Sequence, residues 1–475
     1  MKYKIIGLIC CAAIIATGVI APIVDGQSSA NAATERYQQH LEAEEKAECS
    51  HGEDYTGLCS HLPVVCIDTG NVAIPGAPYR GSFTTAANGE TYVNATIKIV
   101  DNYGTMNHTT DKASMTSSME IRIRGKSSRY FLKKGYLIKL TNENGDSSAQ
   151  QVLGMDAHDE WALHGPYLDK TLMRNYMMYN ISGEIMGYAP NVRFCEVVLN
   201  GKYAGVYVMT ETVTNGSNGS RLPLSITKKG VKFGTYLLRE DTGSSNPIKN
   251  IKVYPEYVNT VLNIVYPDGK ALDQAVADKI QEDFEEFENL LKSGNCNLNE
   301  VIDMKSFADY FLINEVTANY DAGRLSTYIY KGLDGKFRMV VWDFNNCCDN
   351  YQHAALSREK FDLWWRPWFR ELFTYHEFTE YLINEYHELR KTYFTTEYLY
   401  SYIDDVIDYL GDAIDRNFER WPTAFTSDLL KPAERNQRSY DEAITDFKEF
   451  FEERIKWMDE NIDNIQEYYD ERNGR

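Results

Sequence analysis

Residues 319–344 read NYDAGRLSTYIYKGLDGKFRMVVWDF. Within this stretch, two apolar, β-rich runs at 326–331 and 336–342 flank an Asp-Gly pair, which favours the tight turn of a β-hairpin. Folding the hairpin back brings Asp343, after the second run, close to the residues that lead into the first run, among them Asp321. The sequence therefore predicts two carboxylates at one end of a short hairpin.

A pair of carboxylates in this position suits phosphoryl transfer. One acidic group accepts the hydroxyl proton of the acceptor, and the other holds the divalent metal that bridges the nucleotide phosphates. Protein kinases place their catalytic Asp and their metal-binding Asp in a similar loop and hairpin. Aspartate at a strand end is also common in ordinary turns, so the hairpin alone leaves both interpretations open. A glycosidase is disfavoured because no carbohydrate-enzyme motif accompanies the pair.

The chain before the hairpin is rich in strands. From 62 to 255 it contains short β-branched runs, and 120–124 alternates with a period of two. Asn200-Gly201 separates two such runs and indicates a hairpin with a type I′ turn. One helix interrupts the pattern, because apolar residues between Leu172 and Ile185 keep helical spacing and Asp169 can cap its start.

The chain after residue 268 is mainly helical. Apolar stripes at helical spacing run through 272–291, 403–421 and 443–458. Such stripes indicate core packing, and no domain boundary separates them from the strands. The sequence predicts an α+β body at 62–468, β-rich at 62–255 and mainly helical at 268–468.

The N-terminus predicts export. Lys2 and Lys4 precede an uncharged apolar run at 5–24, and Ala30-Asn31-Ala32 offers a cleavage site. Residues 1–33 are therefore a signal peptide or an N-terminal membrane anchor, with the lysines inside. The protein is expected to be secreted or anchored at the outer face of the cytoplasmic membrane, with no other contact to the membrane. The Glu-rich segment 34–61 is expected to be a charged stalk or a short helix between the export segment and the body.

Seven cysteines follow the export segment, in a compartment where disulfides persist. Cys49, Cys59 and Cys66 cluster in sequence and are candidates for a local disulfide, although their pairing does not follow from spacing. No CxxC pair or His/Cys spacing indicates zinc. The neighbours Cys347 and Cys348 are expected to be buried thiols rather than a strained redox disulfide.

The composition of the chain favours some classes of partner over others. The net charge of −20, without a basic run, disfavours nucleic acid. The chain has 34 tyrosines and seven tryptophans, and aromatic rings of this kind can stack on glycans. A surface-binding or coat-assembly protein that contacts envelope polysaccharide is therefore the alternative to an enzyme.

Several motifs resemble, in order, those of the CotH kinase family, the spore-coat-protein-H-like atypical kinases. Residues 121–129 with 133–136 resemble the family's RGNSS…KKSY signature, and 200–207 with Glu211 is similar to its NGxYxGxYxxxE hairpin. The triplets ending at Asp321 and Asp343 resemble its NxD and PWD motifs, and 62–69 its opening strand. The resemblance implies an atypical protein-kinase-like, two-lobed fold that uses ATP with Mg²⁺ or Mn²⁺.

The resemblance also implies roles for single residues. Asp321 matches the catalytic aspartate, which acts as general base or orients the substrate, and Asp343 matches the metal-binding aspartate. Glu211 would orient a phosphate-contacting lysine, which is expected to be Lys134, with Lys133 and Lys139 as competitors.

A small-residue turn completes the expected nucleotide site. Arg124, Gly125, Ser127 and Ser128 lie where backbone N–H groups can approach phosphate, and an ordinary β-turn is the alternative. Arg174, on the predicted helix, could reach phosphate or pair with a carboxylate, and its role stays open.

The chain departs from the family pattern at three positions. Ser326 replaces an asparagine metal ligand, Asn345 replaces an acidic residue, and Lys126 replaces the asparagine of RGNSS. The function expected from the resemblance is an exported ATP-dependent kinase that phosphorylates Ser or Thr of surface or coat proteins. Because the departures weaken the metal site, a pseudokinase that serves as a binding or coat-assembly protein is the alternative.

Overall fold

A computed structural model of the chain describes residues 36–51, 56–216, 221–225, 234–251 and 260–473. The chain divides into two units, Met1–Tyr37 and Gln38–Arg475, and the description below concerns the second. The predicted export segment, residues 1–33, lies outside the described residues. Among the helices that are described, none is long and apolar enough to cross a bilayer.

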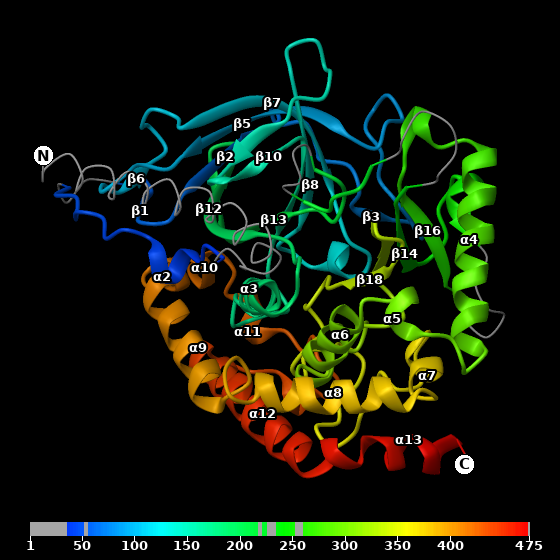
Figure 1. Cartoon of the computed structure of the whole chain (residues 1–475). Coiled ribbons are helices and arrows are strands. Elements are labelled where there is room, and N and C mark those ends of the chain that lie inside the picture. Colours follow the sequence, from blue (N-terminus) through cyan, green and yellow to red (C-terminus); the bar gives the residue numbers. More distant parts are fainter. Residues whose placement is uncertain (1–35, 52–55, 217–220, 226–233, 252–259, 474–475) are drawn as a thin grey trace, which may run out of the picture. The chain divides into compact units, whose positions relative to one another are not determined.

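A closed β-barrel forms the first part of the second unit (Figure 1). Around the barrel the strands follow the order β11-β13-β12-β2-β5-β7-β8, and all neighbours are antiparallel except β12 and β2. Alternate residues of these strands fill the interior, among them Val65, Ile121 and Trp161. The barrel strands are β2 (Val64–Asp68), β5 (Val93–Val100), β7 (Met115–Ile123), β8 (Tyr136–Thr141), β11 (Glu160–His164), β12 (Val192–Leu199) and β13 (Lys202–Glu211).

The predicted hairpin at Asn200-Gly201 is present as β12 and β13. Asn200 and Gly201 both have positive φ, 48° and 72°, as a type I′ turn requires. Three short antiparallel strand pairs form sheets separate from the barrel. They are β1 (Cys59–Ser60) with β6 (Asn107–His108), β3 (Pro78–Tyr79) with β4 (Ser82–Phe83), and β9 (Gln150–Val152) with β10 (Met155–His158).

The predicted helix is α3 (Arg174–Ile185), and nearly all of it is buried. Asp169 accepts a hydrogen bond from Arg174 N at 2.9 Å, so this carboxylate satisfies an amide at the helix start as expected. Tyr176 stacks on Phe194 of β12, with 4.1 Å between ring centroids. The helix therefore joins the outer wall of the barrel to the main hydrophobic core.

The predicted hairpin of 326–342 is also confirmed, as β17 (Thr327–Lys331) and β18 (Phe337–Val340). These strands continue a five-stranded sheet in the order β15-β16-β14-β17-β18. The partners come from the earlier part of the chain: β14 (Tyr236–Asp241), β15 (Asn250–Ile251) and β16 (Val261–Tyr266). The α+β class is confirmed, and one sheet draws strands from both halves of the sequence.

Helices pack on this sheet and on one another. Buried α6 contacts α8, α12 and β18, which places it at the centre of the core. One long stripe was expected at 403–421, but Gly411, with φ +43°, divides it into two helices. The helices are α4 (Gln274–Lys292), α5 (Leu298–Val301), α6 (Met304–Val316), α7 (Phe369–Leu372), α8 (His376–Leu389), α9 (Thr396–Leu410), α10 (Ala413–Arg420), α11 (Thr423–Thr426), α12 (Tyr440–Asn461) and α13 (Ile465–Asn473).

The described part of 34–61 contains a short helix, one of the two alternatives that the sequence offers for this segment. The short helix α2 (Gln39–Glu42) contacts α9, and the buried Gln39 side chain exchanges hydrogen bonds with the backbone of Phe194, at 2.7 and 3.2 Å. The Gln39 amide provides hydrogen-bond partners for the backbone N–H and C=O of Phe194, so this charged part of the sequence belongs to the folded unit.

All seven cysteines in the described part of the chain carry free thiols. Cys347 and Cys348 are buried, as expected. The disulfide predicted among Cys49, Cys59 and Cys66 is not formed in this structure. Cys66 lies on β2 opposite Lys98, outside the cluster to which Cys49 and Cys59 belong.

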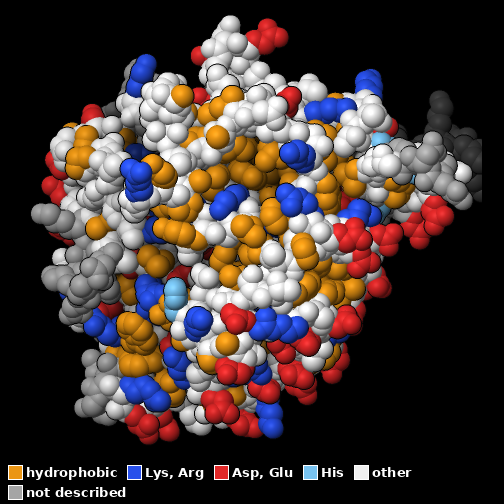
Figure 2. Space-filling model, turned by 180° about the vertical axis from the view of Figure 1, so that it is seen from behind, with side chains coloured by type: hydrophobic (Ala, Val, Ile, Leu, Met, Phe, Trp, Pro, Cys, Tyr) orange, Lys and Arg blue, Asp and Glu red, His pale blue; other side chains and the backbone are white. Residues whose placement is uncertain are grey.

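Charge is spread unevenly over the molecular surface. Figure 2 shows acidic side chains gathered along one side of the face in view, whereas lysine and arginine side chains are dispersed among hydrophobic ones. On this face, the carboxylates therefore lie together on one side.

Candidate active site

Asp343 lies in the turn that leaves β18, and helix α3 holds this turn. The backbone at Asp343 is left-handed, with φ +62°. Its N–H donates to Tyr179 Oη at 2.9 Å, and the N–H of Phe344 donates to Asn175 Oδ1 at 2.9 Å. Two side chains of α3 therefore replace the strand partners that the turn has lost, and they fix the direction of the carboxylate.

Asp321 lies in the loop between α6 and β17. Its Oδ1 accepts from Arg324 Nη2 at 3.2 Å, and its Oδ2 accepts from Asn346 Nδ2 at 2.6 Å. Asn346 follows Asp343 by three residues, so its amide links the two loops. The structure thus brings together the two carboxylates that the sequence predicts to converge.

The pKa of Asp343 reflects the proximity of the two carboxylates. Burial and the negative charge of Asp321 raise the pKa of Asp343, whereas the Arg124 guanidinium lowers it. A divalent cation at this place would relieve both unfavourable effects, because it supplies positive charge to a carboxylate that has lost water.

The atoms around Asp343 that could bind a metal ion are oxygen atoms of carboxylate and amide groups. Asn345 Nδ2 donates to Asp343 Oδ1 at 2.5 Å, and Asn345 Oδ1 accepts from Asn175 at 3.0 Å. Asn319 Nδ2 donates to Asp343 O at 3.4 Å, while Asn319 Oδ1 is buried and has no hydrogen-bond partner among the described residues. Carboxylate and amide oxygens are the ligands of Mg²⁺ and Mn²⁺, so the residues present fit such an ion.

A cavity of about 10 Å³ borders Asp343, and its lining includes Arg124, Tyr179 and Asn345. This volume accommodates an ion or one water molecule, but not a nucleotide.

The predicted phosphate turn lies beside this cavity. Arg124 lines the cavity, and its guanidinium lies 5.3 Å from the centroid of the Trp342 ring. Gly125 has φ +99°, and a Cβ there would lie 1.9 Å from Ser128 Oγ, so only glycine fits. Ser127 begins the short 3₁₀ helix η1 (Ser127–Tyr130). Arg124 therefore faces the site, and the other three residues shape the turn that presents it.

Lys126, one of the departures, does not point freely at the site. Its Nζ forms an ion pair with Asp241 of β14, and this pair ties the turn to the five-stranded sheet. The added positive charge is therefore largely balanced by a carboxylate.

The predicted lysines and Glu211 are not brought together. Lys133 is buried, and its Nζ donates to Val206 O and to Asn417 Oδ1 at 2.5 and 2.7 Å. Lys134 Nζ donates to Arg129 O at 2.6 Å. Glu211 Oε2 accepts from the backbone and side chain of Asn191.

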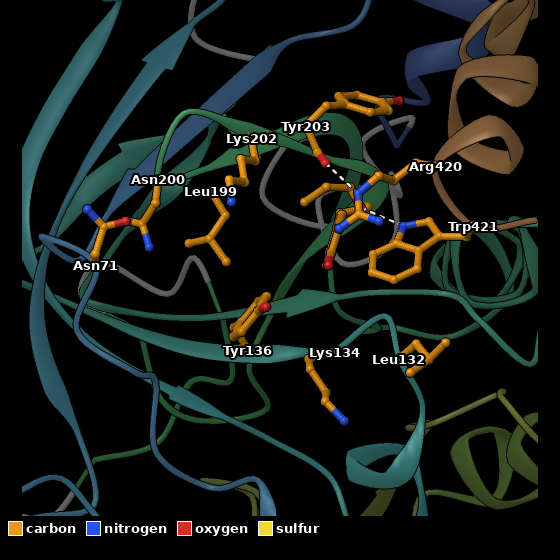
Figure 3. A pocket seen from close by; sticks show the side chains of 12 residues that line it. Asn71, Leu132, Lys134, Tyr136, Leu199, Asn200, Lys202, Tyr203, Arg420 and Trp421 are labelled. Carbon is orange, nitrogen blue, oxygen red and sulfur yellow. Dashed lines mark hydrogen bonds between the residues drawn. The ribbon is translucent and has the colours of Figure 1, made fainter. Parts of the chain in front are cut away.

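The third competitor, Lys139, lies 4.0 Å from Glu160. The kinase-like Lys–Glu pair that the sequence suggests is therefore absent from this arrangement of the described residues. Lys134 instead lines a second cavity, of about 300 Å³, together with Lys202, Arg420 and Trp421 (Figure 3).

Arg174 has a structural role. It is buried, its Nη1 donates to Asp169 at 2.6 Å, and its Nε and Nη2 donate to the carbonyls of Cys347 and Cys348 at 3.2 and 3.3 Å. Of the two roles left open by the sequence, pairing with a carboxylate is the one found. The guanidinium also anchors the loop that carries Asn345 and Asn346.

Sequence reasoning missed the residues that hold the two aspartates, namely Asn175, Tyr179, Asn346 and Arg324. Asn175 and Tyr179 are four residues apart on one helix and so share a face, which is a visible signal. Nothing in the sequence, however, shows that this face meets the turn after β18, because the two segments are separated by about 165 residues.

A family model covers the part of the chain that carries this site. The family model of the CotH kinase protein matches residues 121–458, which is more than half of the chain. The chain belongs to the CotH kinase family. The match includes Arg124, Asp321 and Asp343, so all candidate catalytic and metal-binding residues lie in the part shared with the family.

The CotH kinase family is one of kinase-like phosphotransferases, and its kinase-like character suggests use of ATP and a divalent metal. A search of the curated proteins finds no match to the chain. Strands β1 to β6 precede the matched residues, although β2 and β5 complete the barrel.

Proposed function

We propose that this CotH family member is an exported, ATP-dependent protein kinase that phosphorylates Ser or Thr side chains of surface or coat proteins. The observation that supports this function best is the convergence of Asp321 and Asp343 at one end of the β17–β18 hairpin. Residues 1–33 would export the chain and leave it secreted or anchored at the outer face of the cytoplasmic membrane.

Each residue of the site has a role in this proposal. Asp343, with Asn345 and Asn319, would hold Mg²⁺ or Mn²⁺, which when bound neutralises charge on the nucleotide phosphates. Asp321 accepts the proton of the acceptor hydroxyl, and its hydrogen bonds to Arg324 and Asn346 keep the carboxylate in one orientation. Arg124 supplies fixed positive charge next to the phosphates.

Calorimetric titration of the purified full-length chain with ATP, with and without Mg²⁺, tests this proposal. We expect binding that depends on metal and is lost in Asp343→Ala. Asp321→Ala is expected to bind ATP but to lose phosphoryl transfer. Asp334→Asn, at the far end of the same hairpin, is the matched control and should behave as wild type. Metal-independent binding, or unchanged transfer in Asp321→Ala, would reject the site.

A second candidate function is binding without catalysis. The 300 Å³ cavity combines cations, Lys134, Lys202 and Arg420, with the aromatic ring of Trp421 (Figure 3). Such a lining suits an anionic envelope polysaccharide, because aromatic rings stack on sugars while the cations pair with acidic groups.

Co-sedimentation with purified envelope polysaccharide distinguishes the two functions. Binding that survives Asp321→Ala and Asp343→Ala but is lost in Lys202→Ala would favour the polysaccharide function. Loss of binding in the aspartate variants, with the Lys202 variant unaffected, would exclude it.

A further inference from the structure

Four metal-ligating side chains meet beside the barrel, outside the residues that match the family. They are Cys49, His51, Cys59 and His108, and their ligand atoms all lie within 4.8 Å of one another. The sequence showed no zinc pattern because a gap of 48 residues separates Cys59 from His108. The tertiary structure therefore overturns the expectation that no His/Cys constellation exists.

Backbone pairing places these residues. In the antiparallel pair β1–β6, Cys59 is directly opposite His108 (Figure 1). A parallel bridge between Ala47 and Thr105 lays the segment that carries Cys49 along the same loop. The site is thus assembled from three short chain segments.

The two histidines have the spacing of ligands to one ion. Their Nε2 atoms lie 3.2 Å apart, and their rings are nearly perpendicular, at 83°. Two nitrogens bound to one tetrahedral zinc at 2.0–2.1 Å lie about 3.3 Å from each other. The observed separation therefore allows both lone pairs to point at a single ion.

A carboxylate behind His108 supports the same conclusion. His108 Nδ1 lies 3.0 Å from Asp111 Oδ2, and that oxygen also accepts from His108 N and from Asn102 Nδ2, at 2.9 and 2.8 Å. Metal-bound histidines commonly donate their second ring N–H to a carboxylate in this way, which orients Nε2 toward the metal.

We propose that Cys49, His51, Cys59 and His108 form a structural Zn²⁺ site. Two thiolates and two neutral imidazoles give the closed tetrahedral set of structural zinc, with no position left for a substrate. The ion would link residues 47–51 and Cys59 to His108 of β6. A bound ion would stabilise the first of these segments, because most of 41–51 is exposed and contributes little apolar burial.

Metal analysis of the purified full-length chain tests the proposal. We expect one zinc per chain, lost in Cys59→Ser and in His51→Ala and kept in Cys66→Ser, the matched control outside the cluster. Cobalt(II) added to the chelated protein should give the d–d bands of a tetrahedral site and a thiolate charge-transfer band. Cobalt spectra without the thiolate band would overturn the assignment.

Thermal melting tests the site even if the Cys59 or His51 variant fails to fold. Zinc alone should raise the Tm of the chelated wild-type chain, and by as much in chelated Asp343→Asn, which lacks the metal-binding aspartate of the other site. A Cys49–Cys59 disulfide found by peptide mapping in a zinc-free protein, or a Tm that does not respond to zinc, would also overturn the site. Because the cluster lies outside the kinase-like residues, ATP binding is expected to persist in the Cys59 variant, so failure of one proposal does not imply failure of the other.

Discussion

Asp343 lies close enough to Asp321 for the negative charge of Asp321 to raise the pKa of the Asp343 carboxyl group. Like charges are brought together in folded proteins at a cost, and a site built to hold a cation is a common reason. The neighbouring amides of Asn345 and Asn346 each donate to one of the two carboxylates. These contacts hold the aspartates ready for a metal without neutralising them.

Replacement of Asp343 by asparagine should separate stability from function. In the absence of metal, Asp343→Asn is expected to keep or raise the Tm, because it removes a charge that burial and Asp321 disfavour while it retains an acceptor for Asn345. Metal-dependent ATP binding should be lost. Differential scanning fluorimetry with and without Mg²⁺ and ATP measures both effects, and a clear drop in Tm without metal would contradict the electrostatic argument.

Metal affinity should depend on pH. Since the pKa of Asp343 is raised, protons compete with the metal at higher pH than for an ordinary aspartate. We expect Mn²⁺ to bind more weakly as the pH is lowered from neutral toward the ordinary aspartate range, which titration followed by electron paramagnetic resonance can measure. An affinity that stays constant down to the pH at which the protein unfolds would show that Asp343 is not a ligand.

Restoration of the family asparagine at position 326 should strengthen the metal site. Ser326 has φ +51°, a conformation that asparagine adopts readily. Ser326→Asn is therefore expected to fold normally and to bind Mn²⁺ several-fold more tightly, by calorimetry. Ser326→Ala is the matched control, since alanine adds no ligand and, like serine, carries a Cβ at this positive φ. Equal affinities in all three proteins would remove position 326 from the site.

Loss of the buried Arg174 should destabilise the fold strongly. Arg174→Met leaves Asp169 buried without its partner and releases the carbonyls of the Cys347-Cys348 loop, so we expect a loss of about 3–5 kcal/mol in urea unfolding. Arg390→Met, which breaks a more exposed pair with Asp459, should cost only about 0–1 kcal/mol. Similar losses in the two variants would refute the anchoring role.

Folding stability should depend on the protonation of Glu240. Burial raises the pKa of this carboxyl group to about 8, so its contribution to stability is fully present below the unfolded value of 4.5 and is lost as the pH rises through about 8. Relative to Glu240→Gln, wild type should gain up to about 1.4 kcal/mol per pH unit as the pH falls across this window.

Urea unfolding at several pH values measures this difference. Glu449→Gln, at an exposed position of α12, is the control and should track the wild type at every pH. A difference between wild type and Glu240→Gln that does not change with pH would mean that Glu240 stays ionised in the fold.

Much of the local structure could be predicted because it depends on neighbouring residues. The Asp-Gly pair of 326–342, the Asn200-Gly201 turn and the helical spacing of α3 each follow from backbone sterics and from periodic burial. The break of the 403–421 stripe at Gly411 was missed, although glycine at a helix end is itself a local signal.

The arrangement of the site needed the fold. The sequence by itself determined that Asp321 and Asp343 converge, since a hairpin joins them. Only the tertiary structure decided that Asn175 and Tyr179 hold Asp343, that Lys133 is buried, and that Lys134 faces another cavity. The same holds for the Cys49–His108 cluster. Spacing encodes contacts within a turn or a helix, whereas contacts between distant segments depend on which surfaces pack together to bury the core.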